Sequence, residues 1–205
     1  MPEESAPDGM LVVVSGPSGV GKSTVVNALC VHDSRVVRSV SLTTRRARPD
    51  ETNGTHYAFV TDEAFDRARA AGELLEWAEV HDHRYGTPRQ WVEEQRRQGR
   101  VVVLAIDPQG ARAVRRADAS AVLIFLMPPS WEALEVRLRG RGTEDGDSLQ
   151  RRLRDAHAEL ARARDYDYVV LNDRVETAAV TLGAIITAEQ CRSHRWQSLP
   201  TPPTA

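Results

Sequence analysis

Nine consecutive residues near the start of the chain have the types and spacing of a phosphate-binding loop. The stretch 16–24 reads GPSGVGKST, which fits the pattern GxxxxGK[ST], and it lies between a valine-rich run and an amphipathic stretch. Glycines at these positions let backbone N–H groups approach phosphate oxygens, and the amino end of the following helix adds positive potential. The sequence therefore predicts that the whole loop binds a nucleotide such as ATP: Gly16, Pro17, Ser18, Gly19, Val20, Gly21, Lys22, Ser23 and Thr24.

The lysine of this loop is unusual within the chain. Of the 27 lysine and arginine residues, Lys22 is the only lysine. A compact ammonium group fits among phosphates as a point charge, which a planar guanidinium does not, so we expect Lys22 to be required for catalysis. Lys22 is expected to reach the β- and γ-phosphates, and the Ser23 hydroxyl is predicted to be a ligand of Mg²⁺.

A second group of anion-binding side chains lies between residues 39 and 48. Arg45 and Arg48 stand beside several hydroxyl groups, including that of Ser41. Two arginines of this kind suit bidentate capture of a phosphate group, with the serine hydroxyl as a further donor. Arginine clusters also occur on solvent-exposed surfaces, so this pattern alone leaves both interpretations open.

Several motifs in a fixed order make the chain similar to one enzyme family. From about Leu11 to Asp173 the chain resembles guanylate kinase. The matching stretches, in chain order, are GPSGVGKST, SVSLTTR, LLEWAEV, RYGTPR, IDPQGA and GRGTE. The resemblance implies a phosphotransferase of guanine nucleotide metabolism that moves the γ-phosphate of ATP to GMP, and also to dGMP. ATP and GMP are then its small-molecule partners, and Mg²⁺ is its cofactor.

The resemblance also assigns the acceptor site. Its implied GMP-binding residues are Ser41, Arg45, Arg48, Tyr57 and Tyr85 at the phosphate, Glu76, Thr87 and Asp107 at the base, and Gly86, which has no separate role. The chemistry of guanine agrees, because a carboxylate can accept hydrogen bonds from N1–H and N2–H₂ while a hydroxyl meets O6. Adenine would leave these buried groups unpaired, at a cost of about 1–3 kcal/mol each.

Simpler interpretations exist for three of these residues. Thr87 precedes a proline and could be no more than a helix cap. Glu76 could lie on the solvent side of an alternating strand, and Tyr57 could simply pack in the core. Their joint occurrence around one phosphate-binding loop favours the acceptor site.

A lid at about residues 139–152 is a further implication of the resemblance. Arg137, Arg141 and Arg152 would close over ATP and, with Lys22 and Arg45, stabilise the phosphoryl group during transfer. Asn172, at the end of an apolar run, would lie near the adenine of ATP. The lid region is rich in arginine throughout, and an asparagine at a strand end often only forms a turn.

At Ala105 the chain departs from the sequence pattern of the family. The family's pattern has an acidic residue two positions before Asp107, where this chain has alanine. That carboxylate would support the metal or its waters, so the departure bears on metal organisation and on the turnover rate.

Three other functions are compatible with part of the sequence. A small GTPase is suggested by the DxxG pattern at residues 107–110, but the stretch 171–174 reads LNDR and not NKxD. A kinase of a phosphorylated sugar would share the loop and lid but would have no need for Glu76 and Thr87. A binding module of the same family that had lost catalysis would have no need for Lys22 or Arg45.

The elements that must position these residues follow from the hydrophobic pattern. Apolar runs at 11–14, 101–106, 121–127 and 168–171 are predicted to be buried strands, each followed by a helical pattern. This alternation predicts an α/β protein with a P-loop three-layer fold, in which a parallel sheet lies between helices. Shorter strands are expected at 57–60 and 74–80. Helices are expected from Asp62 to Gly72, from Thr87 to Gly99, from Ser130 to Gly140 and after Asp147.

The length of the chain suits one domain. We expect it at residues 10–192, with the P-loop at 16–24, a GMP-binding insert at about 39–89 and the lid at about 139–152. Flexible tails are expected at 1–9 and 193–205, where proline is frequent.

Composition excludes several other classes of protein. The formal net charge of −2 and the pI near 6.3 provide no global basic field, so neither nucleic acid nor an anionic membrane is an expected partner. Cys30 and Cys191 have no CxxC spacing and no leader pattern precedes the first strand, so a cytoplasmic protein is expected. His81 and His83 lack a third ligand nearby and are expected to be loop residues. The sequence favours neither a monomer nor a homo-oligomer.

Overall fold

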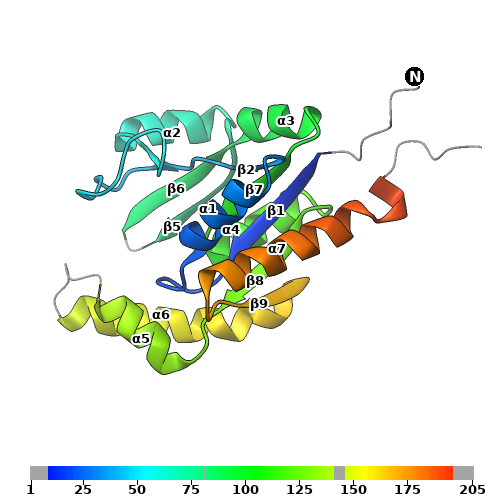
Figure 1. The fold of residues 1–205 in the computed structure, drawn as a ribbon. Coiled ribbons are helices and arrows are strands. Elements are labelled where there is room, and N and C mark those ends of the chain that lie inside the picture. The colour runs from blue at the N-terminus through cyan, green and yellow to red at the C-terminus, as the bar shows by residue number, and fades with distance from the viewer. Residues whose placement is uncertain (1–8, 81, 141–145, 196–205) are drawn as a thin grey trace, which may run out of the picture.

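A parallel sheet forms the centre of the molecule (Figure 1). The structure is a computed structural model that describes residues 9–80, 82–140 and 146–195, without the side chains of 146–149 and 151. Within these residues, five strands pair in the order β2-β7-β1-β8-β9, and every pairing is parallel. The strands are β1 (Met10–Ser15), β2 (Val36–Arg38), β7 (Val101–Ala105), β8 (Val122–Met127) and β9 (Tyr168–Leu171). The predicted α/β class and parallel core are confirmed.

Alternation along β1 shows how the helices cover both faces of the sheet. Met10, Val12 and Val14 point into a cluster that includes apolar side chains of α1 (Lys22–His32), α5 (Trp131–Arg139), α6 (Gly146–Leu160) and α7 (Val175–Gln190). Leu11 and Val13 point into a second cluster with α3 (Arg89–Arg97) and α4 (Pro108–Ala117). Because both faces are buried, the strands are continuous apolar runs, as expected for a parallel sheet between helices.

The insert forms a second, mixed sheet of its own. Its strands pair in the order β4-β3-β6-β5, with β3 and β4 parallel and the other two pairings antiparallel. A small cluster of Phe65, Ala68 and Leu74 lies between this sheet and α2. The elements are β3 (Leu42–Thr43), β4 (Ala58–Phe59), α2 (Asp62–Ala70), β5 (Leu74–Val80) and β6 (His83–Pro88).

Three helix starts differ from the prediction. The N-cap of α2 is Thr61 and not Asp62, because the Thr61 hydroxyl accepts from the N–H of Ala64 at 3.2 Å. Thr87 does not cap α3: it lies within β6, paired with Glu76 across the hairpin. Helix α6 begins at Gly146, so Asp147 lies inside its first turn.

The start and end of α5 agree with the prediction. The Ser130 side chain accepts from the N–H of Ala133, and Gly140 is the C-cap.

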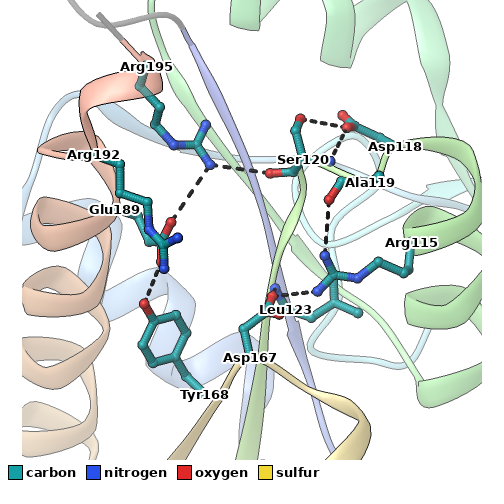
Figure 2. A network of polar contacts seen from close by, with 10 residues as sticks. All are labelled: Arg115, Asp118, Ala119, Ser120, Leu123, Asp167, Tyr168, Glu189, Arg192 and Arg195. Atoms are coloured by element: carbon teal, nitrogen blue, oxygen red, sulfur yellow. Dashed lines mark hydrogen bonds and ion pairs between the residues drawn. The ribbon is translucent and has the colours of Figure 1, made fainter.

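The end of the chain packs further than expected. A short helix, η2 (Ser193–Arg195), follows α7, and Arg195 is buried, although a flexible tail was expected from residue 193. Figure 2 shows why: Arg195 donates to the Ser120 carbonyl at 3.2 Å and faces Glu189, which also meets Tyr168 and Arg192. On the other side of the same view, Asp167 accepts from the N–H of Leu123 at 2.8 Å and pairs with Arg115. The contacts of Arg195 and Glu189 fasten η2 and α7 beside the amino ends of β8 and β9, and those of Asp167 tie the start of β9 to β8 and α4.

None of the helices within the described ranges is both long enough and apolar enough to span a bilayer.

Candidate active site

A cavity of about 440 Å³ opens at the carboxyl ends of β1 and β7. In open parallel sheets, ligands bind beyond the carboxyl ends of the strands. The insert contributes one wall and α6 contributes another, and the two lie on opposite sides of the strand ends in Figure 1. The lining residues are Ser18, Gly19, Gly21, Lys22, Ser23, Thr24, Ser41, Arg45, Arg48, Tyr57, Glu76, Val80, Asp82, His83, Tyr85, Ala105, Ile106, Asp107, Arg152 and Glu159.

The predicted phosphate-binding loop connects β1 to α1. The backbone φ values of Gly16, Gly19 and Gly21 are 142°, 81° and 99°. Residues other than glycine rarely adopt such values. At Gly16 a Cβ atom would also lie 2.4 Å from the Leu126 carbonyl oxygen. The glycines therefore permit a tight path that ends at Lys22, the first residue of α1.

Lys22 lines the cavity and folds back onto its own loop. Its Nζ donates to the carbonyls of Gly16 at 2.6 Å and Pro17 at 3.1 Å. Ser23 and Thr24 follow in the first turn of α1 and also line the cavity. The ammonium group is thus held at the site where phosphates are expected.

Two predicted ATP-site residues support the loop from outside the cavity lining. The Nδ2 atom of Asn172 donates to the Val20 carbonyl at 2.7 Å, and Nη1 of Arg137 donates to the same carbonyl at 3.3 Å. Arg137 also donates to the Asn172 carbonyl through Nη2 at 3.2 Å. The Oδ1 atom of Asn172 is buried without a hydrogen-bond partner among the described residues, so it is an acceptor in need of a donor.

The five residues predicted at the GMP phosphate all line the cavity. They are Ser41, Arg45, Arg48, Tyr57 and Tyr85. Tyr57 and Tyr85 meet edge to face with ring centroids 5.8 Å apart, and the Arg45 guanidinium lies 5.5 Å from the Tyr57 ring centre. Aromatic faces of this kind attract a cation and limit its movement.

Glu51 orients the two arginines. Nη2 of Arg45 lies 2.8 Å from Glu51 Oε1, and Glu51 Oε2 accepts from the N–H of Arg48 at 2.9 Å. Burial opposes ionisation of Glu51, but its hydrogen bonds with Arg45 and Arg48 prevail and lower its pKa. Burial likewise disfavours the Arg45 cation, while Glu51 and Tyr85 outweigh it and raise the pKa of Arg45. Both groups are therefore charged at neutral pH, and Arg45 is preset to receive an anion.

The predicted base-reading residues lie together at the junction of β5, β6 and α4. Glu76 is only 5% exposed, and its Oε1 accepts a 2.6 Å hydrogen bond from the hydroxyl of Thr87. Glu76 and Asp107 line the cavity, whereas Gly86 and Thr87 lie behind it. Asp107 caps α4, where its two oxygens accept from Gly110 and Gln109. Thr87 is thus a partner of Glu76.

The ionisation of Glu76 is poised near neutrality. Burial is the largest cause and raises its pKa to about 7; the Thr87 hydrogen bond acts in the opposite sense, and the nearby Asp107 charge adds to the increase. A carboxylate that has lost its water in this way gains most from a ligand that donates hydrogen bonds to it.

The lid residues are only partly within the described structure. Arg152 is buried, lines the cavity and donates to the Ser18 hydroxyl at 3.2 Å. Arg141 and His81 lie outside the described residues. His83 lines the cavity, and the described part of the chain holds no group of three or more His, Cys, Asp or Glu side chains placed to bind a metal.

Comparison with known proteins decides the family. The protein-family model for guanylate kinase matches residues 8–189. The chain is 49% identical over 189 residues to the guanylate kinase of Symbiobacterium thermophilum, covering 92% of this chain and 90% of that protein. The chain belongs to the guanylate kinase family. It is also 52% identical over 175 residues to the guanylate kinase of Streptomyces coelicolor, covering 85% and 89% of the two chains.

A solved structure of the same family supports the fold. The crystal structure of guanylate kinase from Anaplasma phagocytophilum is similar with a TM-score of 0.81 and 37% identity, covering 94% of this chain and 92% of that one. The resemblance predicted from the motifs is confirmed, and these comparisons do not favour the sugar-kinase or binding-module alternatives.

Sequence reasoning missed three residues of the guanylate kinase site. Glu51 lies between the SVSLTTR and LLEWAEV motifs and received no role, and Gly110 lies in the IDPQGA motif. A Cβ atom on Gly110 would lie 2.7 Å from Glu76 Oε2, so this glycine leaves room for the Glu76 carboxylate. Glu159 has no motif around it, and only the packing of α6 on the loop brings it to the cavity.

Proposed function

We propose that this protein transfers the γ-phosphoryl group of ATP to GMP, yielding ADP and GDP, and that dGMP is a second acceptor. The observation that carries the proposal is that Lys22 of the phosphate-binding loop and the buried Glu76 line one cavity. A cation for the donor phosphates and a carboxylate for guanine are thereby present in the same space. The implied contacts engage the base and phosphate of the acceptor, which supports use of the deoxy form.

The insert holds the acceptor. Arg45 and Arg48 bind the GMP phosphate with the hydroxyls of Ser41, Tyr57 and Tyr85. Glu76 accepts from N1–H and N2–H₂ of guanine, while Thr87 orients Glu76, and Asp107 supplies a second acceptor near the base. Adenine has an unprotonated N1 and would leave the desolvated carboxylate unpaired, at a cost of about 1–3 kcal/mol.

The core and α6 hold the donor. Backbone N–H groups of residues 16–24 and the Lys22 ammonium bind the phosphates of ATP. Arg152 lies at the same end of the cavity and neutralises charge on the phosphoryl group as it moves, with Arg45 and Arg141 in the same role. Arg137 and Asn172 brace the loop, and the unpaired Oδ1 of Asn172 suits the amino group of adenine.

Transfer needs little chemistry from the protein beyond positioning. An oxygen of the GMP phosphate forms a bond to the γ-phosphorus, while the bond from that phosphorus to the bridging oxygen breaks and its electron pair leaves with ADP. We assign no general base, because the GMP phosphate is already anionic at neutral pH. The arginines and Lys22 stabilise the charge on the transferring phosphoryl group.

Mg²⁺ is the cofactor that the family implies, and Ser23 fits it. The Ser23 hydroxyl lines the cavity beside Lys22, which suits a metal that keeps several waters and binds mainly through phosphates. When bound, the ion neutralises phosphate charge. Ala105 leaves the end of β7 without a carboxylate.

The direct test is an ADP-release assay with ATP and Mg²⁺ in which the acceptor is varied. GMP and dGMP should support turnover, whereas AMP, CMP, UMP and a phosphorylated pentose should not. Lys22→Ala is the matched control, because it should lower the rate by about 100-fold or more while GMP binding and thermal stability stay near wild type. Turnover with the pentose alone, or near-normal turnover of Lys22→Ala, would refute the proposal.

A further inference from the structure

Glu159 is a carboxylate in the donor site that the proposed reaction does not use. It lies on α6, lines the cavity and accepts from the N–H of Ser18 through Oε2 at 3.3 Å. Burial raises its pKa to about 6, and the Lys22 charge acts in the opposite sense. At neutral pH the side chain is therefore mainly an anion inside the phosphate-binding loop.

Helix α6 holds Ser18 at two points. Arg152 lies seven residues before Glu159, which is about two helical turns, so the two side chains share one face of α6. Arg152 donates to the Ser18 hydroxyl at 3.2 Å, while Glu159 accepts from the Ser18 amide. Lys22, meanwhile, donates to the carbonyls of Gly16 and Pro17. The Ser18 amide and hydroxyl and the Lys22 ammonium are thus all engaged by other groups of the protein.

We propose that Glu159 is a positioning residue of the ATP site, an internal anion that accepts from the loop amide of Ser18 and competes with the phosphates of ATP for it. A loop amide and the Lys22 ammonium attract any anion, and Glu159 supplies one from the protein itself. Phosphates bring further negative charge into the same cavity, where screening by water is weak, so the carboxylate must leave Ser18. The displacement also removes one of the two contacts that hold α6 to Ser18.

Other charged groups near Glu159 do not supply this role. Lys22 of α1 faces it with opposite charge, while Asp107 at the N-cap of α4 and Asp155 one turn earlier on α6 carry the same charge as Glu159. Asp107 already accepts from two backbone N–H groups of α4. Glu159 is the one of these three carboxylates whose hydrogen bond to the loop amide is seen.

The test is calorimetric titration of ATP into Glu159→Gln, without GMP and at a pH well above the pKa of Glu159. Glutamine keeps the size and the acceptor oxygen but removes the charge. The Kd for ATP should fall by about three-fold or more, because charge repulsion is lost while the amide contact persists. The Kd for GMP should not change, since GMP binds in the insert. Glu93→Gln, an exposed carboxylate on α3, is the matched control and should change neither value.

Weaker or unchanged ATP binding by Glu159→Gln would overturn the proposal, since the carboxylate would then assist the nucleotide or be irrelevant to it. If that variant does not fold, Glu159→Asp gives a second answer: the shorter side chain draws the charge away from Ser18, and ATP should bind tighter than to wild type. Equal or weaker binding there would likewise overturn it. The inference rests on the proposed ATP site but not on the acceptor, so a failure of GMP turnover and a failure here are distinguishable.

Discussion

At the scale of single residues, the polar side chains of the acceptor site are held in place before any substrate arrives. Arg45 is fixed by Glu51 and Tyr85, and Glu76 is fixed by Thr87. Each of these partners restricts a rotamer-rich side chain, which lowers the entropy that a ligand must remove on binding. The arginine end is charged at neutral pH, whereas the glutamate end is near its midpoint, so the two ends respond differently to pH.

We predict that GMP binding weakens as the pH falls through about 7, the pKa that burial gives Glu76 in the free protein. Guanine N–H groups stabilise the ionised carboxylate, so GMP lowers the pKa of Glu76. By linkage, the affinity for GMP is highest above pH 7, where Glu76 is ionised, and it decreases by up to about ten-fold per pH unit below pH 7. Calorimetric Kd values for GMP across this range measure the effect.

The GMP phosphate titrates near pH 6 and needs a control. Glu76→Gln should bind GMP more weakly than the wild type at high pH. Its Kd for GMP should no longer change with pH near 7, but any change caused by titration of the phosphate should remain. ATP binding should be unaffected by the substitution. Identical pH profiles for the two proteins, or equal weakening of GMP and ATP by Glu76→Gln, would contradict the assignment of Glu76 to the base.

At the scale of elements, four of the five described core strands could be predicted from the sequence, but β2 was missed and the insert was predicted only in part. Strands buried on both faces, such as Val101–Ala105, are continuous apolar runs that need no knowledge of their neighbours. Strand β6 was missed because Thr87 and Pro88 match the start of a helix. Its strand structure comes from pairing with β5, in which Thr87 faces Glu76, and such pairing is a tertiary contact that local spacing does not contain.

The same reason separates the site residues that were predicted from those that were missed. The phosphate-binding loop is one contiguous motif whose chemistry follows from its own residues, and the cavity does bring most of it together with Arg45 and Glu76. Glu159 reaches Ser18 only because α6 packs beside the loop, 141 residues further along the chain.

The packing of α4 against β5 leads to a second prediction. A Cβ atom on Gly110 would lie 2.7 Å from Glu76 Oε2 and 3.2 Å from Asp107 Oδ1. Gly110→Ala should therefore displace the carboxylate and raise the KM for GMP by about ten-fold or more, because small misplacements at a reacting or binding group are costly. The KM for ATP should stay within about two-fold of wild type, as measured in the same steady-state assay.

Gly183→Ala on α7 is the matched control for this substitution. Its Cβ atom would meet Leu29 at 3.6 Å, an ordinary contact, so both KM values should remain those of wild type. Alanine has the higher helix propensity, so neither variant should lose stability from the backbone itself. An unchanged KM for GMP in Gly110→Ala would mean that the position of Glu76 is not set by α4.

At the scale of the whole molecule, the two ends of the sheet have different tasks. The carboxyl ends of the strands carry the cavity, while the amino end of β8 is where α7 and η2 are fastened (Figures 1 and 2). Tyr168, Glu189, Arg192 and Arg195 line no part of the cavity. This separation means that stability and catalysis can be altered independently.

Arg195→Met tests that separation. Arg195 is 8% exposed, donates to the Ser120 carbonyl at 3.2 Å and lies 3.9 Å from Glu189 Oε2. Methionine keeps an extended apolar side chain but removes the guanidinium. The Ser120 carbonyl then loses this donor, and the buried Glu189 keeps only Arg192 as a cationic partner among the described residues. We expect the free energy of unfolding, measured in urea, to fall by about 1–3 kcal/mol. The kcat and both KM values should be those of wild type at a temperature where each protein is folded.

Arg192→Met provides the comparison within the same network. Its side chain is 56% exposed, and it pairs with the same Glu189 at 2.9 Å. Water and salt screen this pair, so the loss should be much smaller than that of Arg195→Met. Both variants remove one guanidinium from Glu189, so the difference between them measures the burial of Arg195 together with its hydrogen bond to the Ser120 carbonyl. Equal decreases in the free energy of unfolding would show that the two arginines stabilise the protein to the same extent despite their different exposure. A reduced kcat in Arg195→Met would show that the amino end of the sheet is coupled to the cavity.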